Sequence, residues 1–294
     1  MKYIFLNLKR FDIERRLGGV NSLVAPAEWG RHIASQLEQG LLSIENSGDT
    51  ACQFAVFFPE AHLIPAGQAL AECVSGGMEA ARLQLGCQSI YSQDVAVGGN
   101  FGAFTSLRTA TAMSQLGCRW TIIGHSEERR AKATVMAMAG AEPDRITATL
   151  HQLLNQEILC AQQAGLKVLY CIGESEEDLP RRSQVLAHQL TEGLAGVDLS
   201  TVVLGYEPLW AIGPGKTPPS AQQIAQVTAE VKSLCSCPVV YGGGLKKENA
   251  ESIGAIKELD GGLIALTRFT GDIGFYPQEY LEIVSTYVKG VGDC

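Results

Sequence analysis

Short runs of apolar residues recur along the chain, and longer stretches in which apolar residues return every three or four positions separate them. The short runs are nearly continuous rather than alternating, which is typical of strands that are buried on both faces of a parallel sheet. The stretches between them have the period of amphipathic helices. The pattern predicts eight strands, at residues 3–9, 52–59, 86–92, 119–124, 166–173, 201–207, 238–244 and 261–267.

The alternation of strands and helices predicts an α/β fold. Eight strand–helix units within 294 residues favour a single closed (β/α)8 barrel over an open doubly wound sheet. No linker or low-complexity tract separates the units, so we expect one domain over residues 1–294. The segment 129–165 is long for one helix, and the break at Gly140–Pro143 predicts two helical pieces in an extended fourth connection.

Composition and charge narrow the range of partners. The chain is 46% hydrophobic and 18% charged, and no apolar run approaches the ~18 residues of a membrane helix. Charged residues return at Lys9 and Arg10, too early for the apolar core of a signal peptide, so we expect a cytoplasmic protein. The net charge of -8 argues against nucleic acid and anionic membranes, which bind basic surfaces. A small molecule is the expected partner.

Neither the cysteines nor the glycine-rich stretches indicate a cofactor. The nine cysteines are an odd number and several lie in apolar runs, which indicates reduced thiols rather than a disulfide framework. Cys235 and Cys237 are one residue apart with no second cysteine or histidine pair nearby, so we expect no metal site. In residues 213–217 a nucleotide-binding P-loop would require glycine at the position of Trp210. We expect no nucleotide cofactor.

Polar side chains follow several of the predicted strands. Asn7 and Lys9 follow the first strand, His125 and Glu127 the fourth, and Glu207 the sixth. Strand ends carry the chemistry of such barrels, and a lysine, a histidine and a glutamate at one mouth suit proton abstraction beside a carbonyl group. The alternatives to a catalytic role are that Lys9 is a solvated surface lysine and that His125 is hydrogen-bonded to backbone. Glu207 is the most informative residue, because a carboxylate that emerges directly from a buried strand is costly to desolvate.

Four motifs resemble those of the triosephosphate isomerase family: "IIGHSEERR", "VLYCIGE", "GYEPLWAIGPGKT" and "VVYGGGLKKENA", in this order on the fourth to seventh predicted strands. The weaker "FLNLK" is similar to that family's Asn-x-Lys on the first strand. The resemblance covers nearly the whole chain. It implies a TIM barrel, isomerisation of a small phosphorylated sugar with no metal or organic cofactor, and a homodimer formed through the loop that contains "GAFTSLRTA".

The resemblance also implies roles for matched positions. Glu207 would be the base and His125 a neutral electrophile, while Lys9 would hold the substrate; a neutral histidine and a lid that excludes water are established for that family. Residues 208–218 would form the lid, with its tip from Gly213 to Gly215. The implied substrate-binding set is Asn7, Glu127, Gly213, Gly215, Gly243, Gly244, Ala265 and Leu266.

This sequence departs from the family pattern where the substrate phosphate is expected. Gly244 stands where the family has serine, and Ala265 and Leu266 replace a Gly-Gly pair, so side chains stand where backbone approaches an anion. The leading hypothesis is interconversion of glyceraldehyde 3-phosphate and dihydroxyacetone phosphate. A related isomerase of a tetrulose phosphate is the alternative, and a barrel that binds a sugar phosphate without turnover is a third. Residues 271–280 have no counterpart in the family pattern.

Overall fold

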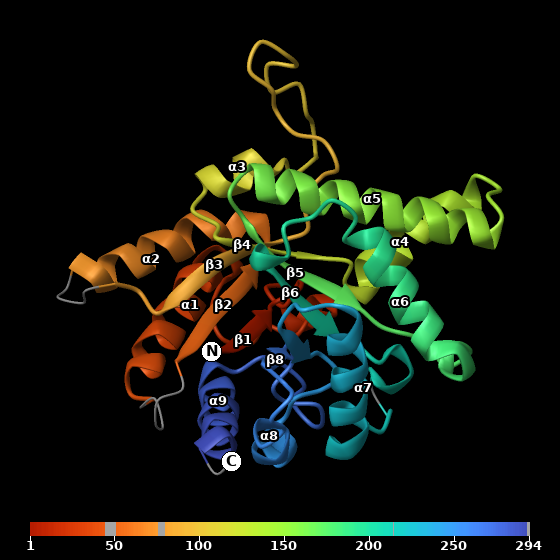
Figure 1. Ribbon diagram of the computed structural model, residues 1–294. Coiled ribbons are helices and arrows are strands. Elements are labelled where there is room, and N and C mark those ends of the chain that lie inside the picture. Colours follow the sequence, from red (N-terminus) through yellow and green to blue (C-terminus); the bar gives the residue numbers. More distant parts are fainter. Residues whose placement is uncertain (45–50, 76–79, 214, 293–294) are drawn as a thin grey trace.

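The computed structural model describes residues 1–44, 51–75, 80–213 and 215–292. Eight strands pair in parallel in the order of the sequence, and the last pairs with the first (Figure 1). This closed barrel confirms the single (β/α)8 architecture. The strands are β1 (Lys2–Asn7), β2 (Cys52–Phe58), β3 (Leu83–Gln88), β4 (Trp120–Ile123), β5 (Lys167–Ile172), β6 (Val202–Tyr206), β7 (Val239–Tyr241) and β8 (Gly261–Ile264).

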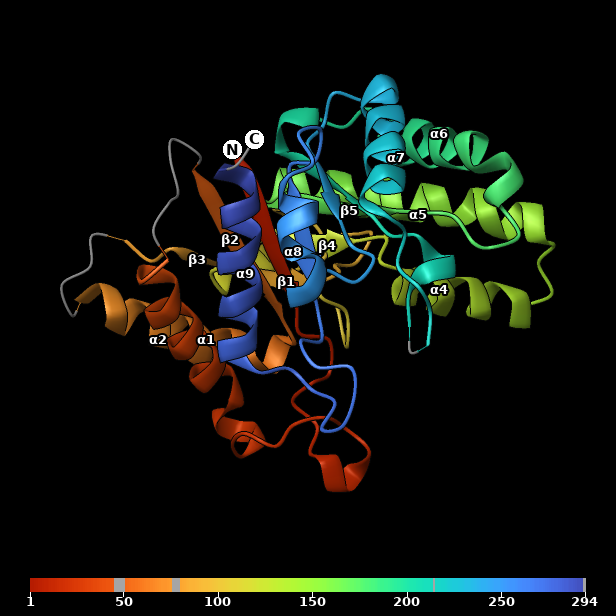
Figure 2. The same ribbon diagram turned by 90° about the horizontal axis from the view of Figure 1, so that it is seen from below.

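Helices surround the barrel on all sides (Figures 1 and 2). They are α1 (Pro26–Leu42), α2 (Leu63–Ser75), α3 (Ala110–Gln115), α4 (Ser126–Met138), α5 (Pro143–Gln163), α6 (Arg182–Gly193), α7 (Ala221–Leu234), α8 (Lys247–Gly254) and α9 (Pro277–Gly292). Short 3-10 turns in the described part of the chain are η1 (Arg15–Leu17), η2 (Glu60–His62), η3 (Leu179–Arg181), η4 (Leu199–Thr201) and η5 (Leu209–Ala211). None of the helices in the described ranges is long and apolar enough to cross a membrane.

Strand residues alternate between the inside of the barrel and the layer of helices. Phe5, Phe57 and Trp120 belong to the inner cluster, and the ring centroid of Phe5 lies 5.7 Å from that of Phe57 and 4.9 Å from that of Trp120. Their neighbours Ile4 and Leu6 belong to the larger cluster between strands and helices. Both faces of each strand are therefore apolar, which explains the nearly continuous hydrophobic runs.

The third strand lies earlier in the sequence than predicted. It spans Leu83–Gln88, whereas residues 86–92 were expected, because Gln84 and Gly86 interrupt the apolar run. Gly86 belongs inside the strand, since a Cβ there would lie 2.5 Å from the Phe57 ring. The strand ends at Ser89, whose φ of 71° is incompatible with extended backbone. This shift places the Gln88 side chain at the barrel mouth.

Two segments extend the basic barrel. The connection 129–165 contains most of α4 and all of α5, and the chain breaks between them from Met138 to Pro143. No side chain of α4 is buried, and α4 packs against α5 (Figure 2). After β8, Arg268 pairs with Gly274 in an antiparallel bridge. The Arg15 guanidinium donates to the Tyr276 hydroxyl at 2.6 Å. Residues 271–280 are thus fastened to the connection that follows β1.

Candidate active site

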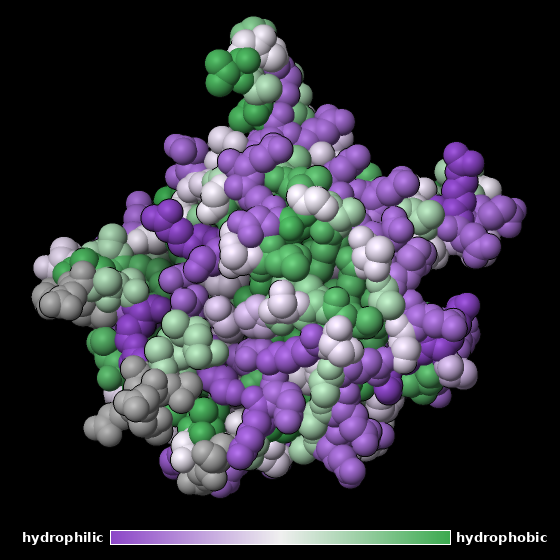
Figure 3. Space-filling view, in the orientation of Figure 1, coloured by the Kyte–Doolittle hydropathy of each residue, from purple (hydrophilic) through white to green (hydrophobic). Residues whose placement is uncertain are grey.

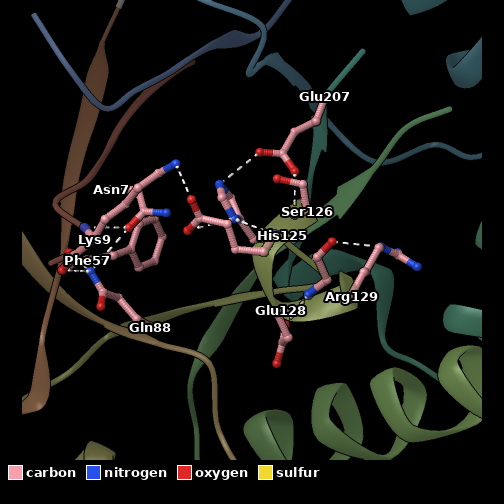
Figure 4. A network of polar contacts seen from close by, with 11 residues as sticks. Asn7, Lys9, Phe57, Gln88, His125, Ser126, Glu128, Arg129 and Glu207 are labelled. Atoms are coloured by element: carbon pink, nitrogen blue, oxygen red, sulfur yellow. Dashed lines mark hydrogen bonds and ion pairs between the residues drawn. The ribbon is translucent and has the colours of Figure 1, made fainter. Parts of the chain in front are cut away.

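Three of the predicted site residues come from separate strands and meet at one end of the barrel. Asn7 ends β1, His125 follows β4 and Glu207 follows β6. Because all the strands run parallel, their carboxyl ends lie at the same mouth. Figure 4 shows the His125 ring between the Glu207 carboxylate and the side chains of Asn7 and Lys9.

The Glu207 carboxylate is buried and polarised by its neighbours. The residue is 3% exposed, its Oε1 lies 3.2 Å from His125 Nε2, and its Oε2 accepts the backbone N–H of Ser126 at 3.1 Å. Burial raises the pKa of Glu207, although His125 and the Ser126 amide act in the opposite direction. Gly173 allows this close packing, since a Cβ there would lie 1.8 Å from the Glu207 carbonyl oxygen. A carboxylate with a raised pKa is well suited to take up a proton.

The position of the proton on His125 follows from its hydrogen bonds. His125 precedes the first residue of α4, and its Nδ1 accepts the backbone N–H of Glu127 at 3.3 Å. With Nδ1 as an acceptor, Nε2 is the ring nitrogen that carries a hydrogen, and it lies 3.2 Å from Glu207 Oε1. The same Nε2–H is available to a carbonyl oxygen of a substrate.

Lys9 lies on the opposite side of His125 in an uncommon backbone conformation. Its φ is 42°, and its N–H donates to Asn7 Oδ1 at 3.1 Å. Such strain in a residue with a side chain is found mainly at functional sites. The Lys9 ammonium lies 2.8 Å from Glu127 Oε1. Burial works against the charged form of Glu127, but the Lys9 ammonium lowers its pKa overall.

Gln88 is a site residue that the sequence analysis missed. Its Nε2 lies 3.2 Å from Asn7 Oδ1, 3.1 Å from the Lys9 carbonyl oxygen and 3.1 Å from the Phe57 carbonyl oxygen. These hydrogen bonds tie β1, β2 and β3 together at the mouth and hold Lys9 in place. A glutamine at the end of an apolar strand could have indicated this residue. It was overlooked because the third strand was predicted over residues 86–92, which places Gln88 inside the strand rather than at its end.

The predicted lid begins immediately after Glu207. Leu209–Ala211 form η5, and Trp210 Nε1 donates to Glu174 Oε1 at 2.9 Å. The Tyr206 hydroxyl donates to the same oxygen at 2.9 Å. Gly213 and Gly215 have φ values of 118° and 76°, which favour glycine, whereas Pro214 at the predicted tip lies outside the described residues. The first hinge of the lid is thus attached to the end of β5.

The glycine turn after β7 lies beside Glu207. A Cβ on Gly242 would be 3.1 Å from Glu207 Cγ, and one on Gly243 would be 2.5 Å from the Tyr241 hydroxyl. That hydroxyl donates to the Gly243 carbonyl oxygen at 2.7 Å. Gly244 has a φ of 103°, so serine at this position would be strained. Ala265 and Leu266 follow β8 and are half-buried, outside the network of His125 and Lys9.

A cavity of about 410 Å³ opens next to the catalytic candidates. Asn7, Lys9 and His125 line one side, and Glu128, Lys132 and Glu157 line another. Lys132 Nζ lies 2.7 Å from Glu128 Oε1 and 2.5 Å from Glu157 Oε1. Burial and the nearby Glu128 raise the pKa of Glu157 to about 8. In the described ranges, no three His, Cys, Asp or Glu side chains are placed to hold a metal ion.

Comparison with known proteins places this site in a family. The family model described as triosephosphate isomerase matches residues 34–272. The triosephosphate isomerase of Prosthecochloris aestuarii is 32% identical over 269 residues, which cover 87% of this chain and 94% of that protein. The one from a Psychrobacter species is 30% identical over 254 residues, covering 80% and 86%.

A solved structure agrees with these matches at the level of the fold. The crystal structure of triosephosphate isomerase from Bartonella henselae superposes with a TM-score of 0.66, at 20% identity, over 97% of this chain and 98% of that one. The fold is therefore shared, and the family is established by the family model and the sequence relatives together. This chain belongs to the triosephosphate isomerase family.

Proposed function

We propose that this chain is an aldose–ketose isomerase that interconverts glyceraldehyde 3-phosphate and dihydroxyacetone phosphate through an enediolate. The observation that carries the proposal is a buried carboxylate, Glu207, whose Oε1 lies 3.2 Å from the Nε2 of His125. A base and a neutral hydrogen-bond donor so close together can act on a carbon-bound proton and on the neighbouring carbonyl oxygen. Relatives at 30% and 32% identity carry the name triosephosphate isomerase.

Glu207 acts as the base in this proposal. It takes a proton from one substrate carbon and returns it to the adjacent one, while the Nε2–H of His125 donates to the oxygen on which negative charge develops. In the structure this Nε2 lies 3.2 Å from Glu207 Oε1. A carbonyl oxygen that accepts the Nε2–H leaves the carboxylate to act as the base. The Lys9 ammonium adds positive charge at the same mouth, and the lid excludes water.

The remaining predicted residues are proposed to hold the substrate. Backbone N–H groups in glycine turns bind anions, and Gly243 lies in such a turn next to Glu207. Asn7 and Glu127 hold the Lys9 backbone and ammonium, respectively. The proposed substrate-binding set is Asn7, Glu127, Gly213, Gly215, Gly243, Gly244, Ala265 and Leu266.

A second substrate, a related sugar phosphate such as a tetrulose phosphate, is favoured by one specific observation. Ala265 and Leu266 carry side chains where the family pattern has glycines, and both are half-buried after β8. Side chains there change the surface that a phosphate or a longer carbon chain meets. The chemistry of Glu207 and His125 suits either sugar.

A coupled isomerisation assay tests the proposal. Purified protein and the variant Glu207→Gln are given glyceraldehyde 3-phosphate and a panel of four- and five-carbon ketose phosphates. We expect triose turnover that falls about 10³-fold or more in the variant, because a general base contributes roughly 10²–10⁴-fold. Turnover of a longer sugar alone would favour the second substrate. Binding without turnover across the panel would make the chain a non-catalytic sugar-phosphate-binding barrel.

We further propose that the chain forms a homodimer. The loop between β3 and α3 stands away from the barrel (Figure 1), and its outer end is partly hydrophobic (Figure 3). Val97 and Phe101 in this loop are 108% and 89% exposed. Apolar area that a projecting loop exposes is surface that association with a second copy would remove from water. The same loop in a second copy is proposed to seat in the cavity of about 410 Å³ beside Lys9.

We also propose that the protein acts in the cytoplasm. The cysteines of the described residues are free thiols, a form that persists in reducing compartments. A small phosphorylated sugar is a substrate of such a compartment.

A further inference from the structure

A pair of cysteines lies at the end of the barrel opposite to Glu207. Cys235 follows α7 and Cys237 precedes β7, so both are in the connection that enters a strand. The candidate catalytic residues instead follow the strands at their carboxyl ends. The pair therefore has no part in the proposed isomerisation.

The two sulfur atoms are already close. Cys235 Sγ lies 3.2 Å from Cys237 Sγ, and a disulfide bond is about 2.05 Å long, so bond formation requires a shift of about 1 Å. The backbone at Cys235 is extended, with φ -149° and ψ 137°. Side chains two residues apart in extended backbone lie on the same side of the chain. A bend at Cys237 follows.

The two thiols differ in how a reagent can reach them. Cys235 is half-buried and lines a cavity of about 440 Å³, whose other walls include Leu194 and Leu234. Cys237 is 2% exposed, and its Sγ lies 3.8 Å from the Leu199 carbonyl oxygen. A small molecule in this cavity therefore meets Cys235 first, and Cys237 lies directly behind it.

The two thiols also differ in their pKa, because the two sulfur atoms share a proton. The Cys237 thiol beside Cys235 lowers the pKa of Cys235 to about 6, although burial acts in the opposite direction. The same contact raises the pKa of Cys237. Since the thiolate is the nucleophile in thiol–disulfide exchange, Cys235 is the attacking group and Cys237 the resolving one.

We propose that Cys235 and Cys237 form a redox-active dithiol that is oxidised by low-molecular-weight disulfides. The Cys235 thiolate attacks one sulfur of the small disulfide, forms a mixed disulfide and expels one small thiolate. Cys237 then gives up its proton, its sulfur attacks Cys235 Sγ, and the second small thiolate leaves. The protein loses two electrons and two protons to the small disulfide, which becomes two small thiols.

The test uses the whole folded protein in buffers of reduced and oxidised glutathione at increasing oxidised fraction. After each equilibration, remaining thiols are alkylated and the protein is digested with trypsin. Cleavage after Lys232 and Lys246 gives a peptide, 233–246, in which Cys235 and Cys237 are the cysteines. We expect this peptide to become lighter by two hydrogen atoms and unreactive to the alkylating reagent in oxidising buffers, reversibly.

Three matched variants separate the roles of the sulfurs. Cys237→Ser retains glutathione on Cys235, since no resolving thiol is present. In Cys235→Ser the remaining thiol of the pair is Cys237. Oxidised glutathione modifies it at least about tenfold more slowly than it modifies Cys235 in the wild type, because Cys237 is buried. Cys73→Ser, at a half-buried thiol on α2, leaves oxidation of the pair unchanged.

Three results would overturn the dithiol. The peptide could keep both alkylatable thiols in fully oxidising buffer, it could be oxidised only after the protein is unfolded, or the wild-type chain could retain a persistent glutathione adduct on Cys235. None of these readouts depends on isomerase activity. Failure of the dithiol and failure of the proposed function are therefore distinguishable.

Discussion

At the scale of single residues, two buried carboxylates show how surroundings decide what an acid can do. Glu207 and Glu157 are both 3% exposed, and burial raises the pKa of each. Their surroundings differ. Glu207 faces the His125 imidazole and a backbone amide, whereas Glu157 shares the ammonium of Lys132 with Glu128. Burial of an acid therefore indicates a function only when the groups that contact it are considered as well.

Glu157 leads to a prediction about stability and pH. Its pKa is about 8 in the folded protein against an ordinary value of 4.5, so the folded state binds more protons between these values. Stability from this group is present below about pH 4.5 and is lost as the pH rises towards 8. The variant Glu157→Gln does not lose this stability as the pH rises, because a glutamine does not titrate. We expect the variant to gain on the order of 1–2 kcal/mol relative to wild type between pH 5 and pH 8.

Urea unfolding at several pH values measures this difference. Glu258→Gln, at an exposed carboxylate in the turn before β8, is the matched control and should follow the wild-type profile. Parallel profiles for Glu157→Gln and wild type would contradict the assignment of a raised pKa to Glu157.

At the scale of elements, helix α7 illustrates how local sequence sets a boundary. Ser220 precedes its first residue, Ser220 Oγ accepts the N–H of Gln223 at 3.3 Å, and the Gln223 side chain accepts the N–H of Ser220 at 2.9 Å. This capping box satisfies two N–H groups that the helix leaves free. It also fixes the end of the predicted lid, since α7 begins at Ala221, three residues after Pro218, where the predicted lid ends.

Loss of the cap should destabilise the fold. Ser220→Ala removes the hydroxyl acceptor and is expected to lower the free energy of unfolding by about 1 kcal/mol. Ser233→Ala in the last turn of the same helix loses only a hydroxyl that donates to the Glu230 carbonyl oxygen at 2.7 Å. Urea unfolding measures the free energy of unfolding of both variants. Equal values for Ser220→Ala and Ser233→Ala would show that the cap contributes nothing.

Positions at the barrel mouth could be predicted where the pattern is local and not where packing decides. The positions of Glu207 and His125 were predictable because each lies within two residues of the end of a strong apolar strand. Gln88 was not visible, because the end of β3 depends on the packing of Gly86 against Phe57. The ion pair of Lys132 with Glu157 was equally hidden, since it joins α4 to α5 across a chain separation that no local pattern reports.

At the scale of the whole molecule, the closed barrel brings the strand ends to one mouth, so residues as distant in sequence as Lys9 and Glu207 lie close enough to act on one small substrate in the proposed reaction. The proposed dimer adds a second copy to that mouth through the loop that carries Val97 and Phe101. The departures at Ala265 and Leu266 lie at the end of the last strand, and their effect on substrate choice depends on the assembled mouth.

The dimer is tested by removing the apolar end of the loop. The double variant Val97→Ser and Phe101→Ser is expected to sediment as a monomer at concentrations where the wild-type chain is a dimer, because it loses the exposed apolar area that association would bury. Val135→Ser, at a 68% exposed side chain on α4, is the control and should stay dimeric. A wild-type chain that sediments as a monomer would rule out the homodimer.

Exchange of carbon-bound hydrogen tests the central claim, proton transfer by Glu207, most directly. Dihydroxyacetone phosphate is incubated in heavy water with wild type or with Glu207→Gln, and loss of its carbon-bound hydrogen signal is followed by NMR. We predict rapid exchange with wild type and exchange at least about 10³-fold slower with the variant, because only a positioned base removes that proton. Exchange at the same rate with both proteins, or bound substrate that never exchanges with wild type, would contradict the claim.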